Sequence, residues 1–85
     1  MIALKIENPS DEQREACHQF VRLYKLPRKL VRGTQMHVAK GETLFVQYTE
    51  EKIYLCAHSP LRTSQLAGLI VELVQLVPPL TKVAS

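Results

Sequence analysis

Hydrophobic and polar residues alternate strictly over residues 2–7, where three aliphatic side chains fall on one side of the segment. Strict alternation is typical of a β-strand with one buried face. The segment after it repeats its apolar residues at helical spacing, and Ser10 with Gln13 three residues later forms a capping-box pattern at its start. Because the residue before a proline avoids the helical conformation, Pro27 limits this segment, and we predict a helix over residues 11–25.

Three short runs rich in β-branched and aromatic residues occupy residues 34–58, and the connections between them are short enough for hairpins. These runs predict a three-stranded antiparallel meander. Ser59 and Pro60 then have the pattern of a helix start, with the serine as N-cap and the proline at the first helical position. Two consecutive prolines end this segment, so we predict a helix over residues 60–77 and a C-terminal tail over residues 78–85.

The predicted elements follow the order β-α-β-β-β-α, with a basic connector over residues 26–33 between the first helix and the meander. This order favours an α+β fold in which a mainly antiparallel sheet carries two helices packed on one face. A chain of 85 residues has the length of one domain with one core. We therefore predict a single domain that spans residues 1–85.

The alternation within the meander assigns its side chains to two faces of the sheet. The aliphatic set is expected to face the helices, and it consists of Met36, Val38, Leu44, Val46, Ile53 and Leu55. The opposite face then carries Gln35, His37, Phe45, Gln47, Tyr54, Cys56 and His58. A thiol, two imidazoles and two aromatic rings would share this second face.

Acidic residues are absent from residues 16–41, whereas this stretch holds six Lys or Arg residues of a chain whose net charge is +3. We call its candidate contact residues the basic strip, and they are Arg22, Lys25, Arg28, Lys29 and Arg32. Clustered Lys and Arg side chains favour phosphate binding, and they favour docking to an acidic protein as well. Two local explanations compete with both. Basic residues near a helix C-terminus complement the helix dipole, and charges in a solvated connector need no ligand.

The second predicted helix is more apolar than a helix lying on one sheet face requires. Its polar residues fall within one arc of roughly 100°, and aliphatic residues occupy most of the rest. Either the helix is central and contacts both the sheet and the first helix, or its surplus apolar face binds a second copy or another protein. The candidate dimer interface consists of Leu69, Ile70, Leu73, Val74 and Val77.

Motifs of the common nucleotide-binding, metalloprotease and serine-hydrolase kinds are absent from the sequence, so we predict a non-enzymatic protein without a cofactor. The two cysteines, Cys17 and Cys56, are too few for a disulfide framework. The first residues lack a secretion-signal pattern, and the longest apolar run is shorter and more polar than a membrane span. We expect a cytoplasmic protein with reduced thiols and no membrane partner.

The second face of the sheet raises two further hypotheses. Cys56 and His58 combine a thiol with an imidazole, ligands that suit zinc or copper, but no second close pair completes a metal site, and we predict none. The alternative is that Cys56 is a small buried hydrophobe and His58 an ordinary edge residue. Phe45 and Tyr54 either stack nucleic-acid bases or simply cover the sheet. The candidate contacts on this face are His37, Phe45, Tyr54 and His58.

These patterns together favour a small regulatory or adaptor protein that acts by binding another protein and forms a homodimer. The alternative is an RNA- or DNA-binding module that uses residues 22–32 for phosphate contacts. A thiol or metal site at Cys56 and His58 is the third hypothesis.

Overall fold

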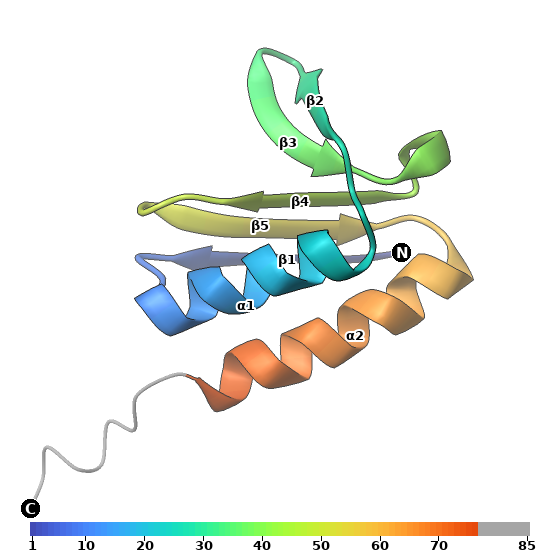
Figure 1. Ribbon diagram of the computed structural model, residues 1–85. Coiled ribbons are helices and arrows are strands. Elements are labelled where there is room, and N and C mark those ends of the chain that lie inside the picture. Colours follow the sequence, from blue (N-terminus) through green and yellow to red (C-terminus); the bar gives the residue numbers. More distant parts are fainter. Residues whose placement is uncertain (77–85) are drawn as a thin grey trace, which may run out of the picture.

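The computed structural model describes residues 1–76, which form an antiparallel sheet and two helices that cover one of its faces (Figure 1). The strands are β1 (Ile2–Glu7), β2 (Arg28–Val31), β3 (Thr34–Val38), β4 (Leu44–Tyr48) and β5 (Lys52–Ala57), and the helices are α1 (Asp11–Leu23) and α2 (Pro60–Gln75). The strands lie in the order β1-β5-β4-β3-β2. The predicted α+β class, with its antiparallel sheet, is confirmed. Residue 77 and the predicted tail over residues 78–85 lie outside the described residues.

Side-chain caps begin both helices. The Oγ atom of Ser10 accepts from the N–H of Gln13 at 3.1 Å, and the Gln13 side chain accepts from the N–H of Ser10 at 3.0 Å, which is the predicted capping box. Ser59 caps α2 by accepting from the N–H of Arg62 at 3.2 Å. Helix α1 ends two residues earlier than predicted, because Lys25 adopts a left-handed conformation with φ of 53°.

The predicted connector over residues 26–33 is wrong in one respect, because it contains a further strand, β2. This strand pairs with β3 through a two-residue turn at Arg32 and Gly33, whose φ angles are both positive, at 51° and 81°. Such a turn matches the twist of two paired strands. Three of the four residues of β2 are exposed and the fourth is half-buried, so no buried side produces an alternating pattern in the sequence.

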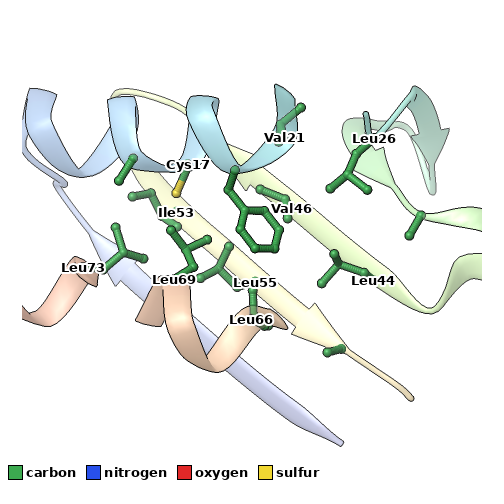
Figure 2. Close-up of a cluster of buried hydrophobic side chains, with 14 residues drawn as sticks. Cys17, Val21, Leu26, Leu44, Val46, Ile53, Leu55, Leu66, Leu69 and Leu73 are labelled. Atoms are coloured by element: carbon green, nitrogen blue, oxygen red, sulfur yellow. The ribbon is translucent and has the colours of Figure 1, made fainter. Parts of the chain in front are cut away.

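The hydrophobic core lies between the helices and strands β4 and β5 (Figure 2). The predicted helix-facing residues of these strands are fully buried, and they are Leu44, Val46, Ile53 and Leu55. The helices contribute Cys17, Phe20, Leu66, Leu69 and Leu73. Buried Gln13 joins the two helices, because its side-chain amide donates to the carbonyl oxygen of Leu73 at 3.1 Å.

Strand β3 presents the opposite faces from those predicted. Its register places His37 opposite a buried core residue of β4, and cross-strand partners share a face of the sheet. His37 and Gln35 therefore lie on the helix side, whereas Met36 and Val38 lie on the open side. A polar residue is accommodated on the helix side because β3 lies beside the core. There the Nδ1 atom of His37 lies 3.4 Å from the carbonyl oxygen of Leu26.

Candidate functional site

The face of the sheet opposite the helices is hollow. A cavity of about 640 Å³ lies on it, and residues of all five strands line this cavity. We call it the outer hollow, and the residues that define it are Lys5, Arg32, Phe45, Lys52, Tyr54 and Cys56. Strand β3 pairs with β4 over only two residue pairs, and the β2–β3 hairpin curls out of the plane of the other strands (Figure 1). The curl explains why the β2–β3 turn, at one edge of the sheet, and strand β5, near the other edge, line the same cavity.

Arg32 and Tyr54 are the two residues that best show this curl. Three strand spacings separate β2 from β5 in the sheet, which would be about 14 Å if the sheet were flat. Both residues nevertheless line the outer hollow, and the Arg32 guanidinium acts electrostatically on the Tyr54 phenol. The pKa of Tyr54 is raised, first by a hydrogen bond with Cys56 and then by desolvation, and the positive charge of Arg32 opposes this rise.

Two aromatic rings, a thiol and an imidazole meet in the centre of the outer hollow. Phe45 lies opposite Cys56 across β4 and β5, and its ring contacts His58 edge to face, with centroids 5.7 Å apart. The Sγ atom of Cys56 lies 3.3 Å from the Nε2 atom of His58. Of the four predicted contacts on this face, the structure thus brings Phe45, Tyr54 and His58 together, and it places His37 on the other face.

Cys56 and His58 provide two ligand types for a soft metal, but a closed site needs four ligands. Among the described residues, no group of three or more His, Cys, Asp or Glu side chains is arranged to hold a metal ion. Cys17, the other thiol, lies in the core, and burial raises its pKa to about 12. The geometry therefore gives Cys56 and His58 a polar contact inside the outer hollow and adds no ligand to them.

Basic residues outnumber acidic ones on the open face of the sheet. The bases are Lys5, Lys29, Arg32 and Lys52, and the acids are Glu7 and Glu42. Lys5 lies 3.5 Å from Glu7, and Lys29 donates to Glu42 at 2.7 Å. The hydrogen bond and charge of Lys29 lower the pKa of Glu42, so this carboxylate stays ionised. Arg32 and Lys52 make no ion pair within the described residues, and their charge is available to an anion.

The basic strip is divided by the structure. Lys29 and Arg32 lie on the open face, and the alternation of β2 directs Arg28 to the other face, opposite His37. Lys25 and Lys29 line a second cavity of about 420 Å³ together with two bases from distant segments, Lys40 and Arg62. We call this cavity the end hollow. Glu42 lines both hollows. Arg22, which is exposed on α1, lines neither of them.

Sequence reasoning missed Lys5 and Lys52 because they are isolated in the sequence. The signal was present in the alternation of their strands, since both lysines alternate with aliphatic residues, which are half-buried in β1 and buried in β5. Their strands are neighbours in the sheet, with Lys5 opposite Tyr54 and Lys52 opposite Glu7. Only the pairing of β1 with β5 shows that both lysines lie in the outer hollow with Phe45 and Tyr54.

A second polar group, also missed, lies on the helix side between α1, β3 and β4. The Nδ1 atom of His18 lies 2.9 Å from the hydroxyl oxygen of Tyr48, and the His37 ring stacks on Tyr48 with centroids 5.6 Å apart. Burial raises the pKa of Tyr48, and the charge of Arg28 opposes the rise. These contacts explain how β3 holds an imidazole on its helix side, and they assign His37 a packing role.

Two of the five residues of the candidate dimer interface on α2 are not on the surface. Leu69 and Leu73 are buried in the core of the chain itself, so they are not available to a second copy. Ile70 is half-buried, Val74 is 64% exposed, and Val77 lies outside the described residues. The central position of α2, which contacts both the sheet and α1, accounts for much of its apolar surface.

The candidate binding surfaces of the described residues are therefore the outer hollow, the end hollow and the exposed side of α2. No helix within residues 1–76 has the length and apolar content needed to cross a membrane. Comparison with models of protein families, with curated proteins and with solved structures finds no match to this chain.

Proposed function

We propose that the protein binds single-stranded nucleic acid on the open face of its sheet. The observation that most supports this function is the position of two half-buried aromatic rings, Phe45 and Tyr54, in a hollow bordered by Lys5, Arg32 and Lys52. Aromatic side chains on a sheet surface stack with bases, and surrounding cations attract the phosphates.

The two rings have a spacing that suits neighbouring nucleotides. Tyr54 lies opposite Gln47, and Phe45 is the diagonal neighbour of Tyr54 across β4 and β5. Diagonal neighbours in an antiparallel pair lie about 7–8 Å apart. A single-stranded nucleic acid that crosses β4 and β5 can place one nucleobase on each ring. The Gln47 amide, which lies beside both rings, offers both a donor and an acceptor to the edge of a nucleobase.

The end hollow extends the positive surface beyond the sheet. Lys25, Lys40 and Arg62 line it, and Lys29 lies at the border with the outer hollow because it is paired with Glu42, which lines both cavities. A bound strand whose bases lie on the aromatic rings would direct its phosphates along this border. One bound nucleic acid would therefore contact all the Lys and Arg residues of the basic strip that face the two hollows.

The test is fluorescence anisotropy with a labelled oligothymidine of about ten nucleotides, a length within the range of known single-strand sites. Phe45→Leu and Tyr54→Leu keep an apolar side chain but remove the stacking surface, and each is expected to weaken binding by roughly 5- to 100-fold. Tyr48→Leu is the matched control, because Tyr48 lies on the helix side against His18 and His37 and lines neither hollow.

Arginine variants separate the hollow from general electrostatics. Arg32→Gln is expected to weaken binding and flatten its dependence on salt, whereas Arg22→Gln, outside both hollows, is expected to change little. Equal losses from both arginine variants, or unchanged binding by Phe45→Leu, would contradict the proposed surface. Binding of polyglutamate as strong as that of the oligonucleotide would show that the surface docks an acidic protein instead.

A further inference from the structure

Strand β1 is an edge strand, and its outward side has no partner strand among residues 1–76. The N–H of Asn8 donates to the carbonyl oxygen of Glu51 on the β5 side at 2.9 Å. Backbone groups along a strand point to alternate sides, so the odd-numbered residues Ala3, Lys5 and Glu7 direct their N–H and C=O groups away from β5. Such a row of unpaired groups is a template for one more strand.

We propose that this edge, together with the adjoining side of α2, binds a second copy of the chain. Antiparallel pairing of β1 with β1 of the second copy would join the two sheets into one, related by a two-fold axis perpendicular to the sheet. The inference does not depend on the proposed nucleic-acid binding.

The charges on β1 favour this partner. Lys5 and Glu7 both project onto the open face, one positive and one negative. A register centred on Ile6 would pair residues 5–7 of the two copies and place Lys5 of each copy opposite Glu7 of the other, so that two ion pairs between the copies join the Lys5–Glu7 pair within each chain. It also brings the two Ile6 side chains together on the helix side. Because Lys5 and Glu7 are odd-numbered, these pairs use the backbone groups that point outward.

The other edge of the sheet lacks this complementarity. The charged side chains of strand β2 are Arg28 and Lys29, both positive. Self-pairing of β2 would bring like charges together across the strands, which is unfavourable. Short, positively charged edges are a common means of preventing edge-to-edge association. The charge pattern thus selects β1 over β2 for a second copy.

The helix layer also leaves apolar side chains beside β1 partly uncovered. Gln65, Gly68 and Glu72 line the groove between α2 and α1, so Ile70 and Val74 lie on the side of α2 that faces away from α1. Because α1 contacts β4, α2 contacts β5, and β1 lies on the far side of β5 from β4, this side of α2 is the one toward β1. Val74 is 64% exposed and Ile70 is half-buried, and the aliphatic residues of β1 are themselves only partly buried. A second copy would cover all of these side chains.

The spacing of the layers allows the two α2 helices to meet. Helix α1 contacts β4 and helix α2 contacts β5. Strands lie about 4.8 Å apart and packed helices about 8–10 Å apart, so a helix pair centred over β4 and β5 places α2 roughly midway between β5 and β1. A two-fold axis beside β1 then lies about 5 Å from α2, and the two α2 helices lie about 10 Å apart, an ordinary packing distance.

Sedimentation equilibrium over a concentration series tests the proposal. The full chain is expected to show twice its 9.7 kDa mass. Lys5→Glu and Glu7→Lys each convert two attractive pairs into repulsive ones, and each is expected to weaken dimerisation by about tenfold or more. The double variant Lys5→Glu/Glu7→Lys restores opposite charges, so it is expected to dimerise like the unmodified chain.

Two apolar variants locate the interface. Val74→Asp is expected to weaken the dimer, whereas Leu30→Asp on β2, where Leu30 is 63% exposed, is expected to leave it unchanged. Circular dichroism checks that each variant is folded. A monomer at every concentration, single charge reversals without effect, or a double variant that remains monomeric would each overturn the proposal.

Discussion

The Nζ atom of Lys29 lies 2.7 Å from the Oε2 atom of Glu42, and this ion pair joins edge strand β2 to the turn at Lys40–Glu42. Lys29 lines the end hollow and Glu42 lines both hollows, so the pair stands where the two positive surfaces meet. Both side chains are more than half exposed, and such pairs contribute little to stability. The larger effect of this ion pair is electrostatic, because the negative charge of Glu42 neutralises Lys29 beside the proposed binding surface.

We therefore expect Glu42→Gln to strengthen oligonucleotide binding. Loss of the carboxylate frees Lys29 for a phosphate, and one further phosphate contact steepens the slope of log affinity against log salt by about 0.7 for a single strand. Anisotropy titrations at several salt concentrations measure both effects. Glu50→Gln removes the same charge from the β4–β5 turn, outside both hollows, and serves as the control. A weaker or unchanged affinity for Glu42→Gln would contradict the role given to the pair.

Gln13 is expected to be a stability determinant, unlike other polar residues of α1. Its side chain both completes the capping box and donates to the carbonyl oxygen of Leu73, inside the core. Gln13→Ala removes both hydrogen bonds, and we expect it to lower the free energy of unfolding by about 1–3 kcal/mol. Gln19→Ala is the matched control, because the side chain of exposed Gln19 donates only to Glu15 of the same helix among the described residues. Urea unfolding of both variants measures the difference, and equal losses would contradict the prediction.

The two cysteines are expected to differ in reactivity toward a thiol reagent. Cys17 is fully buried in the core, whereas Cys56, although only 5% exposed, borders the outer hollow beside His58. A reagent must reach the sulfur atom, so in the folded chain Cys56 is expected to react slowly and Cys17 more slowly still, and both are expected to react fast in urea. Peptide mass analysis after alkylation identifies the modified residue. In Cys56→Ser the remaining thiol is Cys17, and this variant is expected to be unreactive until it unfolds. Prompt labelling of the folded variant would contradict the inaccessibility of Cys17.

The buried Cys17 thiol also predicts how stability depends on pH. Burial, and secondly the charge of Glu72, raise its pKa from the ordinary 9.0 to about 12. Above pH 9 the unfolded chain releases this proton while the folded chain keeps it, so the folded state binds more protons. The contribution is constant below pH 9, and above it the free energy of unfolding is expected to fall by up to about 1.4 kcal/mol per pH unit.

Urea unfolding at about pH 8 and pH 10 measures this decline, with Cys17→Ala as the control. The alanine variant is expected to be less stable at both values because it leaves a cavity, yet it should show a smaller decline between them. The raised pKa values of Tyr48 and Tyr54 start from 10.0 and affect stability at higher pH. An identical decline in the variant would show that Cys17 is not the group responsible.

Local signals in the sequence determined the parts of the fold that depend on neighbouring residues. The capping box of α1, the Ser59 cap of α2 and the alternation of β1 appear in the structure where the sequence predicts them. The same alternation correctly placed the core residues of β4 and β5, because both strands have one side against the helices. In these segments the energy of burial follows directly from the order of the residues along the chain.

The tertiary structure decided what depends on pairing between distant segments. The sequence did not predict β2, because that strand is largely exposed. The alternation of β3 placed His37 on the wrong face, because the apolar residues of this strand lie on the open side of the sheet and the polar ones on the helix side. Register with β4 settled which set faces the helices. The same kind of long-range pairing brought Lys5 and Lys52 beside Phe45 and Tyr54 and separated Arg28 from Lys29. A one-residue change in register reverses the faces of a strand, so the proposed binding surface was determined by hydrogen bonds between strands that no local pattern encodes.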